Sequence, residues 1–404
     1  MRATTIAIGV VLLAIAACDH RRSAEAATPD GSSLRPPTTA PGIYFSNLAG
    51  QIEAAKVVLA RDPASVAAHR NLSALTYVMG RYHGELDEIQ RAIDHASAAI
   101  ARAPSDPALY LQRATQQQTL HRFAAARLDL EQARTLGGDV APLEAELDYA
   151  EGKYDRAIPV LRATAAADPT MRSVARLAAL EHALGREAEA RQAFDAAVGL
   201  VRDTNPVPVA WLEFQRAMFE IDVGQPEKAI QLFRTALRRT PDWVSAQEHL
   251  AEVLAEVGQV DPAIAIYESI VKRSSDPEFK GALASLYRRV GRANEADALV
   301  ATATAEYERM IRAYPEAMAA HASEFFLGVG GNPQRGLELA EADVRARPTV
   351  QGLTSLARAY LLTGQRAAAQ ATLERALALP VTSVALRTLA AQLQERGTAT
   401  EARR

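Results

Sequence analysis

Apolar residues recur along this chain at helical spacing, in two stretches separated by a glycine. In one such unit Val174 and Leu177 precede Gly185, and Ala190 and Phe194 follow it. Residues three and four positions apart share one face of an α-helix. The pattern therefore predicts two antiparallel helices, with Gly185 in the left-handed position that ends the first of them.

Gly185 is one of eight glycines that recur at intervals of 33 to 40 residues. They are Gly152, Gly185, Gly224, Gly258, Gly291, Gly331, Gly364 and Gly397. Five residues after them stand the small residues Ala157, Ala190, Ala229, Ala263, Ala296, Gly336, Ala369 and Ala402. A unit of this size cannot bury its apolar face alone, so successive units stack and share a continuous core. The chain is therefore predicted to be an all-α stack of helix pairs.

Composition agrees with a helical stack and narrows the choice of partner. Hydrophobic residues make up 49% of the 404 residues, whereas aromatic residues make up 5%. Ala and Leu lead the hydrophobic share, and both favour helices over strands. The formal net charge is -3, without a strongly basic block in the repeats. A nucleic-acid partner is therefore not expected.

The recurring positions resemble the tetratricopeptide repeat, whose pattern is W-x2-L-G-x2-Y, then A-x3-F, then a closing proline. In the unit that begins at Val244, the positions are filled by Leu250, Gly258, Ala263 and Tyr267. The resemblance implies a right-handed α-solenoid of antiparallel helix pairs, whose first helices line a concave groove for extended peptides or partner helices. Residues 66–404 are expected to hold about nine repeats and a partial one after residue 382. The full units lie at about 66–106, 107–137, 138–170, 171–209, 210–243, 244–276, 277–316, 317–349 and 350–382.

Both ends of the stack carry an apolar stripe with polar residues around it. A capping helix is expected over 43–65, on a stripe that includes Phe45 and Leu48. Leu386 and Leu389 begin a similar stripe at the other end. Terminal units of a solenoid need such polar outer faces.

Two units depart from the pattern. Gly80 and Ala92 are 12 residues apart instead of five, which predicts a protruding loop inserted around Tyr82 to Asp87. In the unit after Pro107, His121 stands where the glycine is expected.

The two longest glycine intervals, 39 and 40 residues, raise a question of register. Counting back from Gly224 places Glu213, Arg216 and Glu220 at core positions. Burial of charge is unfavourable, so a longer first helix in a register shifted by two residues is expected instead. That register puts Trp211, Phe214, Gln215 and Met218 at the pattern positions. Whether this aromatic stripe packs in the core or lies exposed on the concave wall stays open.

The first residues carry an export signal. The apolar run from Ile6 to Ala17 is too short to span a membrane. It ends in Ile15-Ala16-Ala17-Cys18, which resembles the bacterial lipobox, in which the cysteine is lipidated after cleavage. Residues 1–17 are therefore expected to be a lipoprotein signal peptide, and Cys18, the single cysteine, a lipidation site.

The resulting anchor places the chain in the bacterial cell envelope, facing the periplasm. Asp19 resembles the signal that keeps some enterobacterial lipoproteins in the inner membrane. Residues 18–42 are rich in Ser, Ala, Thr and Pro and are expected to be a flexible tether. The alternative is ordinary signal cleavage at Ala24-Glu25-Ala26, which would discard Cys18.

The chain shows little sign of catalytic chemistry. It has no H-E-x-x-H motif, no pair of spaced cysteines and no G-x-S-x-G motif. The glycines of 331–336 have the spacing of a phosphate loop, but Leu337 and Glu338 stand where that loop needs Lys and Ser or Thr. No catalytic residue, cofactor or metal site is therefore expected.

The expected function is that of a noncatalytic scaffold or adaptor that binds a protein or peptide partner in its concave groove. An alternative is an accessory subunit of an envelope enzyme or assembly complex whose chemistry lies in the partner. An enzyme with a site hidden between repeats is a third class, and self-association is left open. By carry-over from the family, the groove candidates are Arg172, His182, Glu248, Glu252, Arg288 and Arg358. Their mixed charges predict polar, salt-sensitive recognition.

Overall fold

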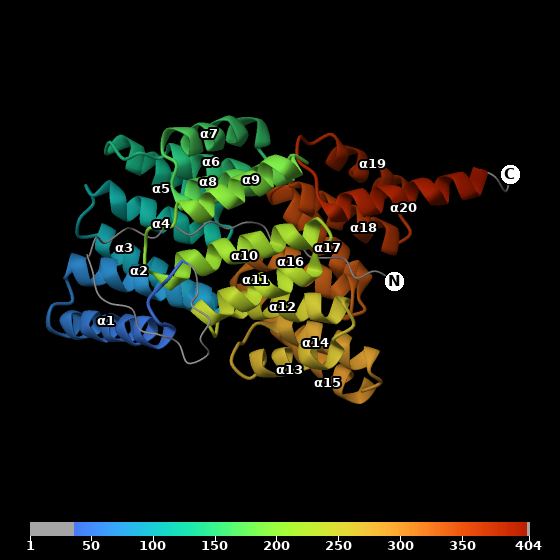
Figure 1. The fold of residues 1–404 in the computed structure, drawn as a ribbon, viewed down its shortest axis with the longest axis horizontal. Coiled ribbons are helices and arrows are strands. Elements are labelled where there is room, and N and C mark those ends of the chain that lie inside the picture. The colour runs from blue at the N-terminus through green and yellow to red at the C-terminus, as the bar shows by residue number, and fades with distance from the viewer. Residues whose placement is uncertain (1–35, 402–404) are drawn as a thin grey trace.

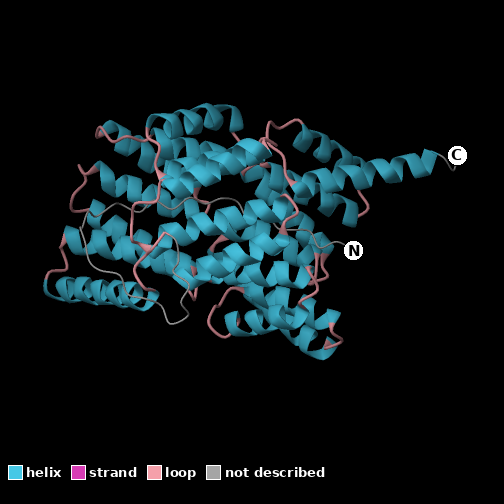
Figure 2. Ribbon diagram, in the orientation of Figure 1, coloured by secondary structure: helices cyan, strands magenta, loops and turns pink. Residues whose placement is uncertain are grey.

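The computed structural model describes residues 36–401, and helices occupy most of that range. The described residues form twenty α-helices and no strand (Figure 2). The predicted fold class, an all-α solenoid of antiparallel helix pairs, is confirmed. The predicted signal peptide, Cys18 and most of the predicted tether lie outside the described residues.

Nine consecutive helix pairs make up the stack, with one further helix at each end (Figure 1). The pairs are α2 (Val66–His83) with α3 (Leu86–Ile100), α4 (Pro107–Thr119) with α5 (Phe123–Thr135), α6 (Ala141–Ala150) with α7 (Tyr154–Ala167), α8 (Met171–Ala183) with α9 (Glu187–Gly199), α10 (Pro206–Asp222) with α11 (Pro226–Arg239), α12 (Val244–Glu256) with α13 (Val260–Ile270), α14 (Pro277–Arg289) with α15 (Ala293–Ala313), α16 (Pro315–Leu327) with α17 (Pro333–Ala346), and α18 (Val350–Leu362) with α19 (Arg366–Leu377). The end helices are α1 (Pro41–Arg61) and α20 (Val384–Glu401).

A residue in the left-handed conformation follows the first helix of every pair. Eight of these nine residues are glycines, with φ between 66° and 86°. The ninth is His121, at φ 54°, so it does replace the glycine in its unit. Gly397, the last glycine of the predicted series, lies inside α20 and makes no turn.

The prediction of a protruding loop inserted around Tyr82 to Asp87 is wrong. The extra residues lengthen α2, which has 18 residues, and Gly84 makes the turn at φ 72°. Gly80 lies inside α2 where the two helices touch, since a Cβ there would be 3.0 Å from Glu88 Cβ. The turn glycine of this unit is therefore Gly84, and Gly80 is a helix-contact position.

The shifted register predicted for the unit before Gly224 is also wrong. Ala217 is fully buried and stands seven residues before Gly224, as Ala178 stands seven before Gly185. The unshifted register therefore holds, and it buries the Glu213 side chain as well as that of Glu220 at 6% and 7% exposure.

Arginines on neighbouring helices make this burial possible. Nε of Arg239 donates to both carboxylate oxygens of Glu213 at 3.1 Å, and Arg239 is itself fully buried. Nη1 of Arg191 lies 2.5 Å from Glu220. A paired and hydrogen-bonded charge can be buried where an isolated one cannot. Each glutamate is thus buried together with an arginine, and the spacing of residues along one helix does not reveal such a partner.

The two long glycine intervals arise in different ways. The 39-residue interval reflects a longer first helix, as predicted, because α10 has 17 residues. The 40-residue interval reflects a longer second helix instead, since α15 has 21 residues and the following first helix, α16, has 13.

Apolar stripes close both ends of the stack. Leu48 and Ala55 of α1 are buried, and α1 packs on α2. Leu386, Leu389 and Leu393 of α20 are buried in one cluster with α18 and α19. The predicted capping role of both segments agrees with this packing.

The segment just before α1 lies on α10 and α11 and does not behave as a free tether. Thr39 donates its backbone N–H to the carbonyl of Thr204 at 2.8 Å. Nη1 of Arg239 donates to the Pro36 carbonyl at 2.9 Å and to Thr38 Oγ1 at 3.0 Å. The tether predicted for 18–42 is therefore wrong for residues 36–42, because 36–40 are held by these contacts and α1 begins at 41.

The superhelix closes on itself. The chain passes through α2–α9, returns through α10–α15, and brings α16–α20 back against its first half (Figure 1). Turns inside the early pairs contact junctions between the late pairs, over sequence separations of up to 227 residues. We call this set of contacts the seam. Its polar contacts are Tyr82 with the backbone N–H of Asp242 (2.7 Å), Glu85 with the hydroxyl of Ser275 (2.8 Å), Asp87 with the hydroxyl of Tyr314 (2.5 Å), His121 with the carbonyl of Glu316 (3.1 Å), Tyr154 with the backbone N–H of Val350 (3.2 Å) and the Ala183 carbonyl with the backbone N–H of Thr382 (2.7 Å).

Gly152 is the tightest point of the seam. Its φ is 80°, and a Cβ there would stand 2.8 Å from the carbonyl oxygen of Pro348. Gly185 has nearly the same backbone conformation, at φ 75°, but a Cβ there would meet nothing within 4 Å. The two positions differ only in the seam contact and so make a matched pair.

Gly185→Ala is expected to lower the free energy of unfolding by about 1 kcal/mol, the usual penalty of a left-handed alanine. Gly152→Ala is expected to cost about 1 to 3 kcal/mol more, because the new methyl group overpacks the seam. Urea denaturation followed by circular dichroism measures both losses. Equal losses would show that the seam does not form in solution.

Arg239→Ala is expected to lower the free energy of unfolding by about 3 kcal/mol, because it leaves the Glu213 carboxylate buried without its partner. Arg238→Ala is the control. Arg238 is exposed next to it, so its loss should change stability by less than about 0.5 kcal/mol. The same denaturation experiment compares them, and similar losses for both variants would contradict the buried pair.

Candidate partner-binding surface

The first helices of the pairs form the inner wall of the superhelix. Successive first helices touch one another: α8 contacts α10, and α16 contacts both α14 and α18. The first helices therefore line the tighter side of the stack. All six predicted groove candidates lie on these helices. They are Arg172 and His182 on α8, Glu248 and Glu252 on α12, Arg288 on α14 and Arg358 on α18.

Four carboxyl groups gather on the inner wall where α12 meets the start of α14. They belong to Glu248, Glu252, Asp276 and Glu278, and their mutual interactions show in the shifted pKa values. We call them the acidic cluster. Glu248 and Glu252 were predicted; Asp276 and Glu278 were not, because they enter from the next repeat.

One imidazole faces the acidic cluster from α16. Nδ1 of His321 lies 2.9 Å from Glu278, and this carboxylate raises the pKa of His321 to about 9. Burial works against the charge on Glu278, but His321 prevails and lowers the pKa of that carboxyl. The two groups therefore form a charged pair at neutral pH.

Glu248 lies at the floor of the acidic cluster, only 4% exposed. Burial raises its pKa well above the ordinary value, and the nearby Glu278, Glu252 and Asp276 add to the effect. Among the described residues it has no hydrogen-bond donor, whereas Glu252 lies 2.7 Å from Nδ1 of His249. Burial and Glu278 likewise raise the pKa of Asp276, to about 6.

A basic group lies on the inner wall of α8. Burial lowers the pKa of Arg172 to about 10, and the neighbouring Arg176 adds to the shift. Arg176 forms an ion pair with Glu146 of α6, whose pKa burial raises to about 7 against the pull of both arginines. The structure thus places the basic candidate Arg172 in a different group from Glu248 and Glu252.

The remaining three candidates are engaged in pairs of their own. His182 Nε2 lies 2.9 Å from Asp222, and Arg288 Nη2 lies 3.0 Å from Asp297. Arg358 forms an ion pair with Glu324 on the preceding first helix. The six candidates therefore do not converge on one site.

The aromatic stripe of α10 packs in the core. Trp211 is 6% exposed and belongs to an apolar cluster that also holds Tyr77 of α2 and Tyr307 of α15. Phe214 and Met218 are half-buried against the next repeats. Of the two alternatives for the stripe, packing in the core is confirmed for Trp211, and exposure on the concave wall is not.

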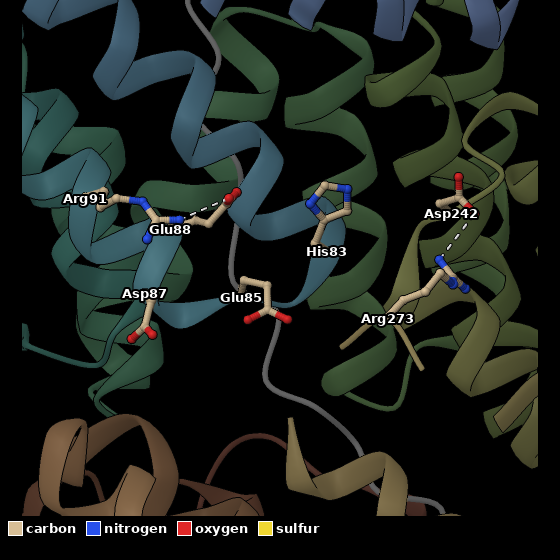
Figure 3. Close-up of a pocket in the computed structure, with 7 residues that line it drawn as sticks. All are labelled: His83, Glu85, Asp87, Glu88, Arg91, Asp242 and Arg273. Carbon is tan, nitrogen blue, oxygen red and sulfur yellow. Dashed lines mark hydrogen bonds and ion pairs between the residues drawn. The ribbon is translucent and has the colours of Figure 1, made fainter. Parts of the chain in front are cut away.

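A polar cavity of about 430 Å³ opens at the seam (Figure 3). Its lining comes from the end of α2, the start of α3, the loop before α12 and the end of α13. The lining residues are His83, Glu85, Asp87, Glu88, Arg91, Asp242 and Arg273. Sequence reasoning missed this cavity because its two sides are joined only by closure of the superhelix.

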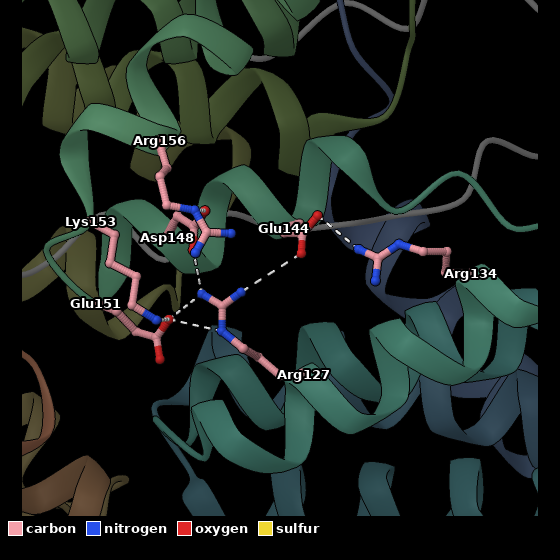
Figure 4. A network of polar contacts seen from close by, with 7 residues as sticks. All are labelled: Arg127, Arg134, Glu144, Asp148, Glu151, Lys153 and Arg156. Atoms are coloured by element: carbon pink, nitrogen blue, oxygen red, sulfur yellow. Dashed lines mark hydrogen bonds and ion pairs between the residues drawn. The ribbon is translucent and has the colours of Figure 1, made fainter.

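Other charges on the first helices hold neighbouring pairs together (Figure 4). Asp148 of α6 lies 2.5 Å from Arg127 of α5 and 3.1 Å from Arg156 of α7. Glu181 of α8 lies 2.9 Å from Arg162 of α7 in the same way. In both pairs of helices, the acidic residue four positions before the turn glycine binds an arginine of the preceding pair. These acidic residues therefore hold neighbouring helix pairs together.

Two searches of the described residues were negative. Within residues 36–401, no group of three or more His, Cys, Asp or Glu side chains is arranged to hold a metal ion. No helix in that part of the chain combines the length and apolar character that a membrane span requires.

Comparison with protein families finds this repeat in three places. The model described as Tetratricopeptide Repeats-Sensor matches residues 225–329, and two tetratricopeptide repeat models match residues 143–204 and 350–380. The chain contains tetratricopeptide repeats. The matched segments cover helices α6–α9, α11–α16 and α18–α19, where the helix pairs described above lie.

Several solved structures are similar to the chain at low sequence identity. The Cut9-Hcn1 hetero-tetramer of the APC/C is 16% identical at a TM-score of 0.47, over 81% of this chain and 62% of that chain. Yeast Tom70 is 15% identical at a TM-score of 0.36, over 90% of this chain and 95% of that chain. MamA is 19% identical at a TM-score of 0.35, over 42% of this chain and 96% of that chain. No curated protein sequence matches the chain.

Proposed function

We propose that the chain is a noncatalytic protein-interaction scaffold, held in the bacterial cell envelope by a lipid on Cys18. The observation that carries the interaction role is the stack of tetratricopeptide repeats with a charged inner wall. Repeat stacks present extended concave surfaces to their partners. The lipobox-like end of the apolar run at Cys18 supports the anchor.

The partner is proposed to bind the inner wall at the acidic cluster. The basic group around Arg172, by contrast, already has a carboxyl of the chain within it, because Arg176 forms an ion pair with Glu146. The side chains of Glu252 and His321, 29% and 28% exposed, border the acidic cluster and leave it accessible. Recognition there is polar and depends on salt concentration.

The anchor is proposed to face the periplasm, with Asp19 favouring the inner membrane. Two or more acyl chains, at about 0.8 kcal/mol per buried methylene, hold a protein stably at a membrane without a transmembrane helix. The segment from 36 to 40, fixed on α10 and α11, would then set where the tether leaves the repeats.

Cys18→Ser is expected to leave the precursor unprocessed, because lipidation must precede cleavage at a lipobox. The measurement is the electrophoretic mobility of the protein and its labelling with a radioactive fatty acid. Normal maturation of the Cys18→Ser protein would contradict the anchor and favour cleavage after Ala26.

Affinity purification of the full chain from detergent-solubilised membranes is expected to recover a stoichiometric protein partner. The double variant Glu248→Gln with Glu252→Gln should recover several-fold less, because it removes two carboxylates from the inner wall. The control is Glu187→Gln with Glu189→Gln, which removes two exposed carboxylates from α9. Absence of any partner would overturn the scaffold role, and recovery of one enzyme in equal amount would make the chain its accessory subunit.

A further inference from the structure

We propose that the acidic cluster is a binding pocket for one cationic side chain, a lysine ammonium or an arginine guanidinium, carried by the partner. This inference rests on the proposed function, since it names the chemistry of the partner segment that enters the inner wall. It predicts a basic partner segment.

The first argument is charge. Four carboxyl groups, those of Glu248, Glu252, Asp276 and Glu278, face two imidazoles, those of His321 and His249. His321 is taken up by Glu278 at 2.9 Å, and the Asp276 carboxylate accepts a backbone N–H of α14 at 2.9 Å. His249 lies 2.7 Å from Glu252, so neither imidazole forms an ion pair with Glu248 in the described part of the chain.

The second argument is a pair of buried polar groups without partners. Tyr267 is 2% exposed, and its buried hydroxyl has no hydrogen-bond partner among the described residues. Burial raises the pKa of Tyr267, and three carboxylates of the acidic cluster, Glu252, Glu248 and Glu278, raise it further. The Tyr267 hydroxyl therefore lies beside the acidic cluster. Nε2 of His249, in a side chain 2% exposed, is also without a partner. Buried polar groups are nearly always hydrogen-bonded, so an empty site is indicated where two are not.

The third argument is shape. Glu252 and His321 lie at the rim, whereas Glu248 and Tyr267 lie at the floor. A long side chain with an apolar stem and a charged head suits such a site, because the head can reach the floor while the stem packs beside aromatic rings.

The site also couples binding to protonation. Burial, with Glu278, Glu252 and Asp276, raises the pKa of Glu248, so part of the empty protein carries a proton there. A bound cation favours the carboxylate and expels this proton. Affinity should therefore increase with pH until Glu248 is ionised in the free protein, by at most about tenfold per pH unit. His321, with a pKa of about 9, stays protonated over this range. The remaining groups that face Glu248 are Glu252 and His249 on α12, Asp276 and Glu278 before and on α14, Tyr267 on α13 and Tyr307 on α15.

The test uses the full lipidated chain in neutral detergent and two fluorescent peptides, one of alternating Ala and Lys and one of alternating Ala and Glu. Fluorescence anisotropy should show that the lysine peptide binds at least about tenfold more tightly than the glutamate peptide. Glu248→Gln with Glu252→Gln should remove most of this preference. Glu187→Gln with Glu189→Gln, which makes the same change in net charge, should keep it. Affinity of the wild-type protein for the lysine peptide should increase as the pH rises above the ordinary range of a glutamate, and Glu248→Gln should reduce that increase to the part contributed by Asp276.

Folding of each variant is checked by thermal denaturation. Glutamine has the shape of the protonated glutamate, so Glu248→Gln should melt at or above the wild-type temperature. Equal weakening by both double variants would reduce the effect to general charge attraction and overturn the pocket, as would an unchanged affinity in Glu248→Gln or tighter binding of the glutamate peptide. These results would leave the scaffold role intact, because that role depends on recovery of a native partner from membranes.

Discussion

Contact between successive turns of the superhelix is the constraint on which the rest of this structure depends. A stack of helix pairs is ordinarily held by neighbour contacts alone, so that each pair touches only the next. Here Asp87 meets Tyr314 and Gly152 lies against Pro348, across about half of the chain. The seam converts a one-dimensional stack into a closed body with an interior. Because of this interior, Glu248 and Arg172 are partly or fully desolvated where an open groove would leave them in water.

Most of the fold could be predicted from the sequence because it repeats. A left-handed turn favours glycine whatever surrounds it, and close helix packing requires a small residue five positions later. Both requirements act within one repeat, so the spacing of Gly152, Gly185 and Gly224 reveals them directly. His121 obeys the same backbone rule without being a glycine, which only the surrounding pattern could indicate.

The errors occur where the surroundings of a residue depend on a contact that its own helix does not reveal. Glu213 looks impossible in a core until Arg239 is seen beside it, and the α2 extension looks like a loop until Gly84 is seen to make the turn. The site shows the same limit. Glu248 and Glu252 follow from their position on a first helix, but Asp276, Glu278 and His321 join them only through packing of three repeats. Closure of the superhelix leaves no signal within a single repeat. The sequence therefore predicts an open groove, whereas in the structure distant helices of the same chain partly fill it.

The fixed segment before α1 has a mechanical consequence. Thr39 and the Pro36 carbonyl are held by Thr204 and Arg239, which lie near the middle of the chain and not at its end. A pull on the N-terminus would therefore load α10 and α11 first, through a buried arginine, before it could peel α1 away from α2. In a protein tethered by its N-terminus, force would enter the repeats at their centre, and both ends of the stack would remain unloaded.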